Sequence, residues 1–128
     1  MHRPINPDAV PAPIGGYSQA IESRPGLRWL HISGQIPVAT DATIPEDFER
    51  QCNLVWDHID QCLRSAGMRW QHLVQVRTYL ASPDYASSNS TIRQLRLQGA
   101  APALTVVVAQ TLDARWLLEV EAVAAAPH

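Results

Sequence analysis

The chain has 128 residues, 46% of them hydrophobic, and a formal net charge of −2 at pH 7. This length suits one domain with a hydrophobic core, and the dispersed basic residues argue against nucleic acid or an anionic membrane as a partner. No run of about 18 apolar residues predicts a membrane span, and no apolar N-terminal stretch predicts a signal peptide. We therefore expect a cytoplasmic protein.

The chain has two cysteines and five histidines, and their spacing argues against a disulfide and a metal centre. Cys52 and Cys62 fall in one predicted helix, whose rise separates them by about 15 Å, beyond disulfide reach. This favours a reducing compartment. The histidines form no pair four residues apart and no Cys-x-x-Cys motif occurs, so we expect no metal. Phosphate-loop and nucleophile-elbow motifs are also missing from the sequence.

The N-terminal part of the chain is predicted to form an arm followed by two strands. Residues 1–16 are rich in proline and are expected to be an extended arm. Residues 17–21 are a short strand candidate. Residues 28–33 alternate as a strand does, with Leu30 and Ile32 on one face.

The clearest predicted helix follows. Apolar residues from Phe48 to Ala66 recur every three or four positions, which predicts an amphipathic helix with one apolar stripe. Thr43 is the expected N-terminal cap, with Glu46 reaching back to it as in a capping box. Gly67 stands where helices commonly end.

A strand and a second helix are predicted next. Residues 73–80 alternate as a strand does. Ser82 is the expected cap of a helix that runs to about Gln98. Its apolar side chains are expected to face inward: Tyr85, Ile92 and Leu95.

Residues 104–110 and 116–124 are predicted to be the last strands. The order β-β-α-β-α-β-β predicts an α+β domain with a mixed sheet. Each helix joins two strands, so right-handed crossovers place both helices on one face of the sheet. The other face then stays bare and partly apolar, which predicts that the chain associates with copies of itself.

Two carboxylates interrupt the apolar run near the C-terminus. Glu119 and Glu121 are two residues apart on a strand and so share a face, while Leu118 and Val120 point the other way. One interpretation is a solvated strand face. The other is a partly covered carboxylate with a raised pKa, as a general acid or base near neutral pH requires.

Two further polar residues stand at positions that suggest a role. Asn89 lies on the inward stripe of the second helix, where its amide must be hydrogen-bonded. It either ties down a neighbouring loop or lines a pocket. His31 on its strand is more commonly a structural histidine than a site residue.

Several segments, taken in order and spacing, resemble the Rid/YjgF family of reactive-intermediate imine deaminases. They are residues 12–20, 31–37, 47–57, 73–80, 84–89, 102–105 and 117–125. The resemblance implies a chorismate-mutase-like α+β fold and a homotrimer that binds small molecules in clefts between subunits. It also implies hydrolysis of imines or enamines such as 2-aminoacrylate to a 2-keto acid and ammonia, with no metal or organic cofactor.

Site residues follow from the resemblance by position. Glu119 matches the glutamate thought to position or activate water, while Glu121 has no assigned role. The positions that match ligand-contacting residues of the family are Tyr17, Ser33, Gly34, Asn89, Leu104 and Thr105.

The main departure from the family is at Leu104, where active imine deaminases have the arginine that clamps the substrate carboxylate. Leucine cannot form that clamp, and hydrogen bonds to charged groups contribute about 1.5–3 kcal/mol. Arg77 shares a predicted strand face with Gln75 and Tyr79. It either supplies a replacement cation or is a solvated arginine.

The sequence therefore leaves alternative functions open. One is hydrolytic deamination of an imine, an enamine or a related nitrogen compound that is not an ordinary 2-imino acid. A second is binding or scavenging of a small metabolite without turnover, because Leu104 makes the cleft more apolar. Ribonuclease activity, attached to some relatives, is disfavoured because no basic groove is predicted.

Overall fold

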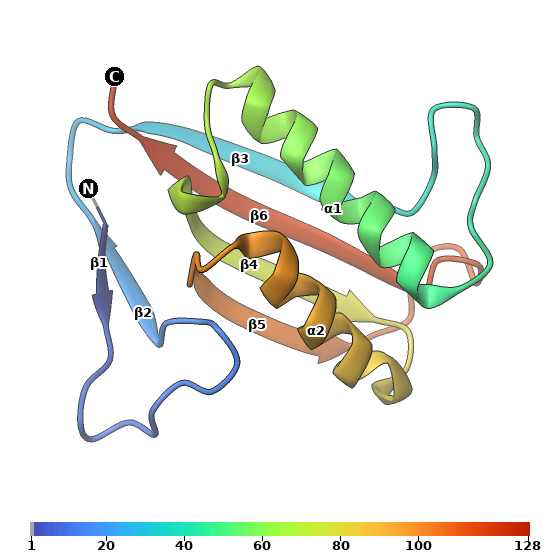
Figure 1. Cartoon of the computed structure of the whole chain (residues 1–128), viewed down its shortest axis with the longest axis horizontal. Helices are drawn as coiled ribbons and strands as arrows, with labels where there is room; N and C mark the ends of the chain where they lie inside the picture. The colour runs from blue at the N-terminus through green and yellow to red at the C-terminus, as the bar shows by residue number, and fades with distance from the viewer. Residues whose placement is uncertain (1) are drawn as a thin grey trace.

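The computed structural model describes residues 2–128. Two helices lie across one face of a four-stranded sheet, and a small hairpin stands beside it (Figure 1). The strands are β1 (His2–Ile5), β2 (Ala20–Ser23), β3 (Arg28–Gln35), β4 (Leu73–Leu80), β5 (Ala103–Val108) and β6 (Leu118–Ala126). The helices are α1 (Phe48–Ser65) and α2 (Ala86–Leu97), and single 3₁₀ turns (Trp70–His72 and Pro83–Tyr85) precede β4 and α2.

The sheet has the strand order β3-β6-β4-β5. β6 is antiparallel to both of its neighbours, whereas β4 and β5 are parallel. Parallel neighbours need a crossover, and α2 supplies it between β4 and β5. The predicted α+β domain, with a mixed sheet and both helices on one face, is confirmed.

The N-terminal segment differs from the prediction. β1 lies within the segment predicted to be an extended arm, and it pairs antiparallel with β2 in a sheet of its own. The first strand after the arm is Ala20–Ser23 rather than residues 17–21. Pairing between segments some fifteen residues apart is set by tertiary structure, which the proline-rich composition of the arm does not reveal.

The hydrophobic core lies between the helices and the sheet. α1 contributes residues with no exposed surface, among them Val55, Trp56 and Ile59. From the sheet, Val76 and Leu118 are also fully buried. This burial supplies most of the stability of a domain of this size, at about 25 cal/mol per Å² of apolar surface.

The N-terminal cap of α1 is Asp47, and the prediction of Thr43 is wrong. The Asp47 carboxylate accepts a hydrogen bond from the backbone N–H of Arg50 at 3.1 Å. Thr43 instead donates its hydroxyl hydrogen to Asp41, so it belongs to the preceding loop. The end at Gly67 is confirmed, because this glycine has a φ of 69° and donates to the Arg64 carbonyl.

α2 begins after a 3₁₀ turn that Ser82 caps, and it buries most of the predicted inward stripe. Asn89, Arg93 and Leu97 are buried, whereas Leu95 is 74% exposed. Leu95 is two residues from both Arg93 and Leu97, which places it roughly 200° around the helix from them. The predicted inward positions of Tyr85, Asn89 and Ile92 are confirmed, whereas the prediction for Leu95 is wrong.

The face of the sheet opposite the helices carries the alternate residues of β6. Glu119, Glu121 and Val123 are partly exposed, while Leu118 and Val120 are buried on the helix side. The shared face of the two glutamates is confirmed. Both helices lie on the opposite side of the sheet, and we call this helix-free side the open face (Figure 1).

Candidate functional site

The candidate site is built on the open face from residues that the strand register places in rows. His31, Val123 and Gln75 form one row, because Val123 pairs with both of the others. In the next row Arg77 lies opposite Glu121. One row further, Tyr79 lies opposite Glu119 and continues the polar surface.

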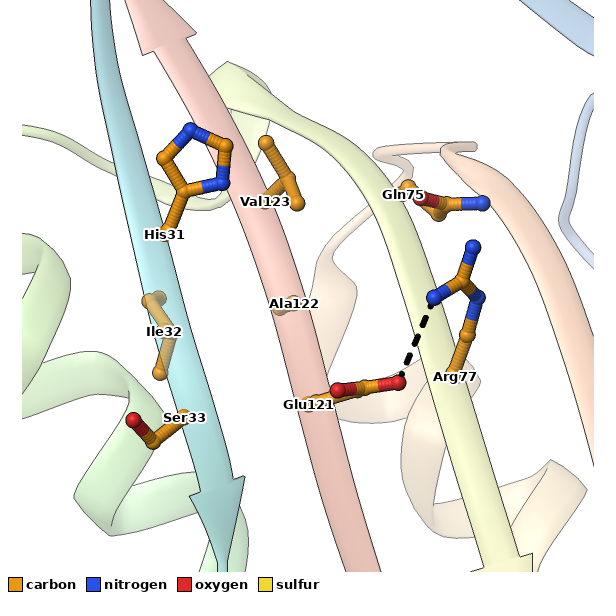
Figure 2. A pocket seen from close by; sticks show the side chains of 8 residues that line it. All are labelled: His31, Ile32, Ser33, Gln75, Arg77, Glu121, Ala122 and Val123. Carbon is orange, nitrogen blue, oxygen red and sulfur yellow. Dashed lines mark hydrogen bonds and ion pairs between the residues drawn. The ribbon is translucent and has the colours of Figure 1, made fainter.

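A hollow of about 300 Å³ lies between the first two rows (Figure 2). His31 and Ser33 border it from β3, and Gln75 and Arg77 border it from β4. The Glu121 carboxylate reaches across from β6, with Oε1 3.5 Å from Nη1 of Arg77. This region, the Arg77 hollow, is lined by charged and neutral polar groups of three strands.

Tyr79 also contacts the Glu121 carboxylate. Its hydroxyl donates to Oε1 of Glu121 at 2.7 Å, and this hydrogen bond raises the pKa of Tyr79 above its ordinary value. The phenol therefore stays a donor through the neutral range. Glu121 is thus oriented by Tyr79 and Arg77 together.

Glu119 lies against a β-bulge in β3. The register between β3 and β6 shifts between Ile32 and Gln35, and Gly34 stands at this irregularity. A Cβ atom on Gly34 would overlap the Glu119 carboxylate and come within 2.8 Å of its Cδ. A glycine is therefore required here for the close approach of the carboxylate.

A second hollow, of about 330 Å³, borders Glu119 on the side away from the Arg77 hollow. Tyr79, Glu121 and the loop 109–112 complete it. We call it the Glu119 hollow. Glu121 lines both hollows, so its carboxylate forms the ridge between them.

Leu104 lies on the other side of the sheet. Its register partner is Val76, which is fully buried, and Leu104 packs against the core on the helix side. Thr105 pairs with Arg77 and is exposed on the open face. Within one chain, Leu104 and Glu119 are therefore on opposite faces of the sheet.

Tyr17 lies beside the start of β5. The next residue, Ser18, donates its backbone N–H to the Pro102 carbonyl at 3.0 Å and its hydroxyl to the Ala101 carbonyl at 2.6 Å. Tyr17, the sequence neighbour of Ser18, is thereby held near the segment that leads into Leu104.

Asn89 lies between the two helices and is 1% exposed. The Cys52 thiol of α1 is 4.0 Å from its Oδ1 atom. The sheet separates this amide from the open face. The structure therefore brings Gly34 and Glu119 together, while Ser33 lines the Arg77 hollow and Asn89 is in a separate buried position.

Sequence reasoning missed the Arg77–Glu121–Tyr79 network. It placed Arg77 and Tyr79 on one strand face, but it could not tell which residues of β6 lie opposite them. Only the pairing register between β4 and β6 reveals these neighbours. An alternation of charges on two predicted strands suggests such pairs but does not align them.

It also missed the buried Arg93. This side chain is 4% exposed, and its Nη2 donates to the Gly15 carbonyl at 2.9 Å. Burial lowers the pKa of the Arg93 guanidinium. Gly15 and Gly16 both have positive φ, so the segment before Tyr17 is bent and held from α2.

Residues 2–128 lack the features of two other classes of protein. No group of three or more His, Cys, Asp or Glu side chains in this range is arranged to hold a metal ion. No helix in the same range is both long enough and apolar enough to cross a membrane.

The fold and the site together define a small α+β protein with helices on one sheet face and a polar, hollowed surface on the other. The family model described as Endoribonuclease L-PSP matches residues 8–126. The chain belongs to this family, the Rid/YjgF family, and the resemblance inferred from the sequence segments is confirmed.

Individual relatives agree with this assignment. A RutC family protein of Pyrococcus horikoshii is 32% identical over 127 residues, which cover 97% of this chain and 98% of that protein. A mouse 2-iminobutanoate/2-iminopropanoate deaminase is 25% identical over 126 residues, covering 97% and 91%. The crystal structure of YyfB, a Rid-family protein of unknown function from Yersinia pestis, is similar with a TM-score of 0.88 at 29% identity, over 98% of both chains.

Proposed function

We propose that this chain hydrolyses the carbon–nitrogen bond of a small imine, enamine or related nitrogen compound, with Glu119 as the catalytic group. The observation that carries the proposal is the placement of Glu119 against Gly34, at the edge of a hollow of about 330 Å³. The 25% identity to a mouse imine deaminase along most of the chain supports it.

The proposed reaction needs no group beyond water and a carboxylate. Glu119 accepts a proton from a water molecule, whose oxygen attacks the imine carbon and forms a carbinolamine. That proton passes from Glu119 to the nitrogen and completes the carbinolamine. Glu119 then takes the proton of the carbinolamine hydroxyl and gives it to the nitrogen, so that the C–N bond breaks and ammonia leaves as the C=O bond forms. An enamine enters this sequence after protonation at carbon gives the imine. Placing water and carboxylate together is the main contribution of such a site.

Leu104 restricts the proposed substrate. A carboxylate bound at this position would lose about 1.5–3 kcal/mol of charged hydrogen bonding relative to an arginine. Leu104 is instead partly buried against the core. We therefore propose a substrate other than an ordinary 2-imino acid.

The proposed assembly is a homotrimer with its small-molecule clefts between subunits. Large apolar side chains remain exposed at the open face and the β5 edge, including Trp29 at 50% and Val107 at 42%. Such surfaces favour association between copies. β5 is an edge strand of the sheet, so a neighbouring copy at this edge would approach both Leu104 and Tyr17. Sedimentation at micromolar concentration tests this, and a stable monomer would contradict it.

The activity is tested by ammonia release from imines without a carboxylate, generated enzymatically in the assay. We expect wild-type protein to accelerate release and Glu119→Gln to lose about 100-fold or more, as expected for loss of a general base. Glu49→Gln, which changes an exposed carboxylate on α1, is the matched control and should keep full activity. No acceleration by wild type, or equal rates for wild type and Glu119→Gln, would contradict the proposal.

A second candidate function is binding of a small metabolite without turnover, and the apolar Leu104 is the observation that favours it. Native mass spectrometry of the purified protein distinguishes the two. A retained small molecule together with no ammonia release on any imine supports a binding protein. Steady turnover that depends on Glu119 supports the enzyme.

A further inference from the structure

The Arg77 hollow has the features of a ligand site separate from the proposed reaction centre. It has a volume of about 300 Å³, at the lower end of small-molecule pockets. Val123 and the Ala122 backbone form its floor, and polar side chains of β3 and β4 stand along its sides (Figure 2). We propose that this hollow binds a small zwitterion that carries one carboxylate and one ammonium group.

Arg77 has N–H donors without a partner among residues 2–128, and these can bind the carboxylate of the ligand. A guanidinium has five N–H donors, and the only ion pair of Arg77 among residues 2–128 is the 3.5 Å contact with Glu121, at the limit of a hydrogen bond. About half of its side-chain surface is exposed (51%). In Figure 2 the guanidinium lies between Gln75 and Glu121, where it can present two parallel N–H groups to a carboxylate.

Glu121 has an acceptor to spare for the ammonium. Both Tyr79 and Arg77 contact its Oε1 atom, and no donor within the described chain contacts Oε2. The Tyr79 hydroxyl fixes the carboxylate in place, so little side-chain entropy remains to be lost on binding. Ser33 lines the β3 side of the same hollow.

The charges of the hollow select a zwitterion. Arg77 and Glu121 cancel, so a ligand with no net charge but with both signs is complementary. A simple anion would be repelled by Glu121, and a simple amine by Arg77, which lowers the affinity of each. Gln75, next to Arg77 in Figure 2, adds a hydrogen-bonding group beside the carboxylate end, and His31 lies across Val123 from it.

This inference goes beyond the proposed deaminase activity and does not depend on it. The Arg77 hollow and the Glu119 hollow share only Glu121. Assembly through the open face would enclose the Arg77 hollow between subunits, so binding is measured on the protein in its solution assembly.

The test is ligand-observed NMR titration in a buffer free of amines and carboxylates, with L-alanine as the zwitterionic probe. Propionate lacks its ammonium group and ethylamine lacks its carboxylate. We expect a Kd for L-alanine at least about tenfold lower than for either partial probe, because each loses a charged hydrogen bond. Binding of propionate or ethylamine as tight as that of L-alanine would overturn the zwitterion assignment.

Variants place the binding in this hollow. Arg77→Gln should raise the Kd for L-alanine at least about tenfold. Arg24→Gln, which removes an exposed arginine outside the open face, should leave it unchanged. Arg77→Lys keeps the charge without the paired donors and should give an intermediate Kd. No binding of L-alanine to wild type, or equal binding by wild type and Arg77→Gln, would overturn the site. Binding without ammonia release would leave this site standing and contradict the deaminase alone.

Discussion

Gly34 and Glu119 are in such close contact that no other residue fits at position 34 while the carboxylate keeps its place. A Cβ on Gly34 would lie 2.8 Å from the Cδ of Glu119. Gly34 is not among the residues with positive φ. The requirement for glycine therefore comes from the neighbouring side chain and not from the backbone conformation.

This relationship predicts the effect of Gly34→Ala. The added methyl group must displace the Glu119 carboxylate, so we expect loss of most ammonia-releasing activity and a destabilisation of about 1–3 kcal/mol, typical of overpacking. Urea unfolding measures the stability. In a Glu119→Ala background the clash is removed, and Gly34→Ala should then cost less. An equal cost in both backgrounds would show that Glu119 is not the group displaced.

The hydrogen bond between Tyr79 and Glu121 predicts how the stability of the protein depends on pH. Its pKa is raised from an ordinary value of 10.0, chiefly by its hydrogen bond to Glu121. Since the folded pKa lies above the unfolded value, the stabilisation by this proton is complete below about pH 10 and is lost as pH rises through the higher folded pKa. Wild type should thus be more stable than Tyr79→Phe at pH 8, and the difference should shrink above pH 10. Urea unfolding of both proteins from pH 8 to 11 checks this, and a difference independent of pH would contradict it.

α2 offers a matched pair of leucines. Leu97 is 1% exposed and Leu95 is 74% exposed. Leu97→Ala should therefore cost about 2–5 kcal/mol, as other buried leucines do. Leu95→Ala should change stability by no more than about 0.5 kcal/mol. Urea unfolding measures the free energy of unfolding of each variant. Similar losses for both variants would contradict the observed orientation of α2, with Leu97 inward and Leu95 outward.

The same pair shows what the sequence could and could not predict. Periodicity was enough to place α1 and to put Glu119 and Glu121 on one face, because a period of two or 3.6 residues is a local property. Leu95 was misplaced because the buried positions beside it are held by Arg93 and Leu97, and the burial of Arg93 depends on its partner in the N-terminal segment.

The pairing register of the strands was the other feature that the sequence could not predict. Nothing local indicates that Arg77 lies opposite Glu121 or that Leu104 faces the helices, because these facts arise from pairing between distant strands. The contact at the Gly34 bulge likewise depends on pairing between distant strands. The glycine is visible in the sequence, but its contact with Glu119 appears only when β3 and β6 are aligned.

The two cysteines should react very differently with a thiol reagent. Cys52 has no exposed surface, and burial raises its pKa to about 12, whereas Cys62 is partly exposed. At pH 8 we expect native protein to react at one thiol per chain, and Cys62→Ser to react only as fast as the chain unfolds. Mass spectrometry of the labelled protein checks this. Rapid labelling of native Cys62→Ser would mean that the helix interface near Asn89 opens readily.

Leu104→Arg tests the link between this position and substrate choice. Leu104 is partly buried, so its replacement should cost about 1 kcal/mol of apolar burial. β5 is an edge strand, however, and the long arginine side chain can extend past that edge to bind a carboxylate. If the proposed assembly places Leu104 of one copy beside Glu119 and the Gly34 bulge of a neighbouring copy, Leu104→Arg should release ammonia from 2-iminopropionate at least about tenfold faster than wild type. Leu104→Met, which keeps an apolar side chain of similar volume, is the control and should show no gain. Equal rates for Leu104→Arg and Leu104→Met in folded protein would show that position 104 does not select the substrate.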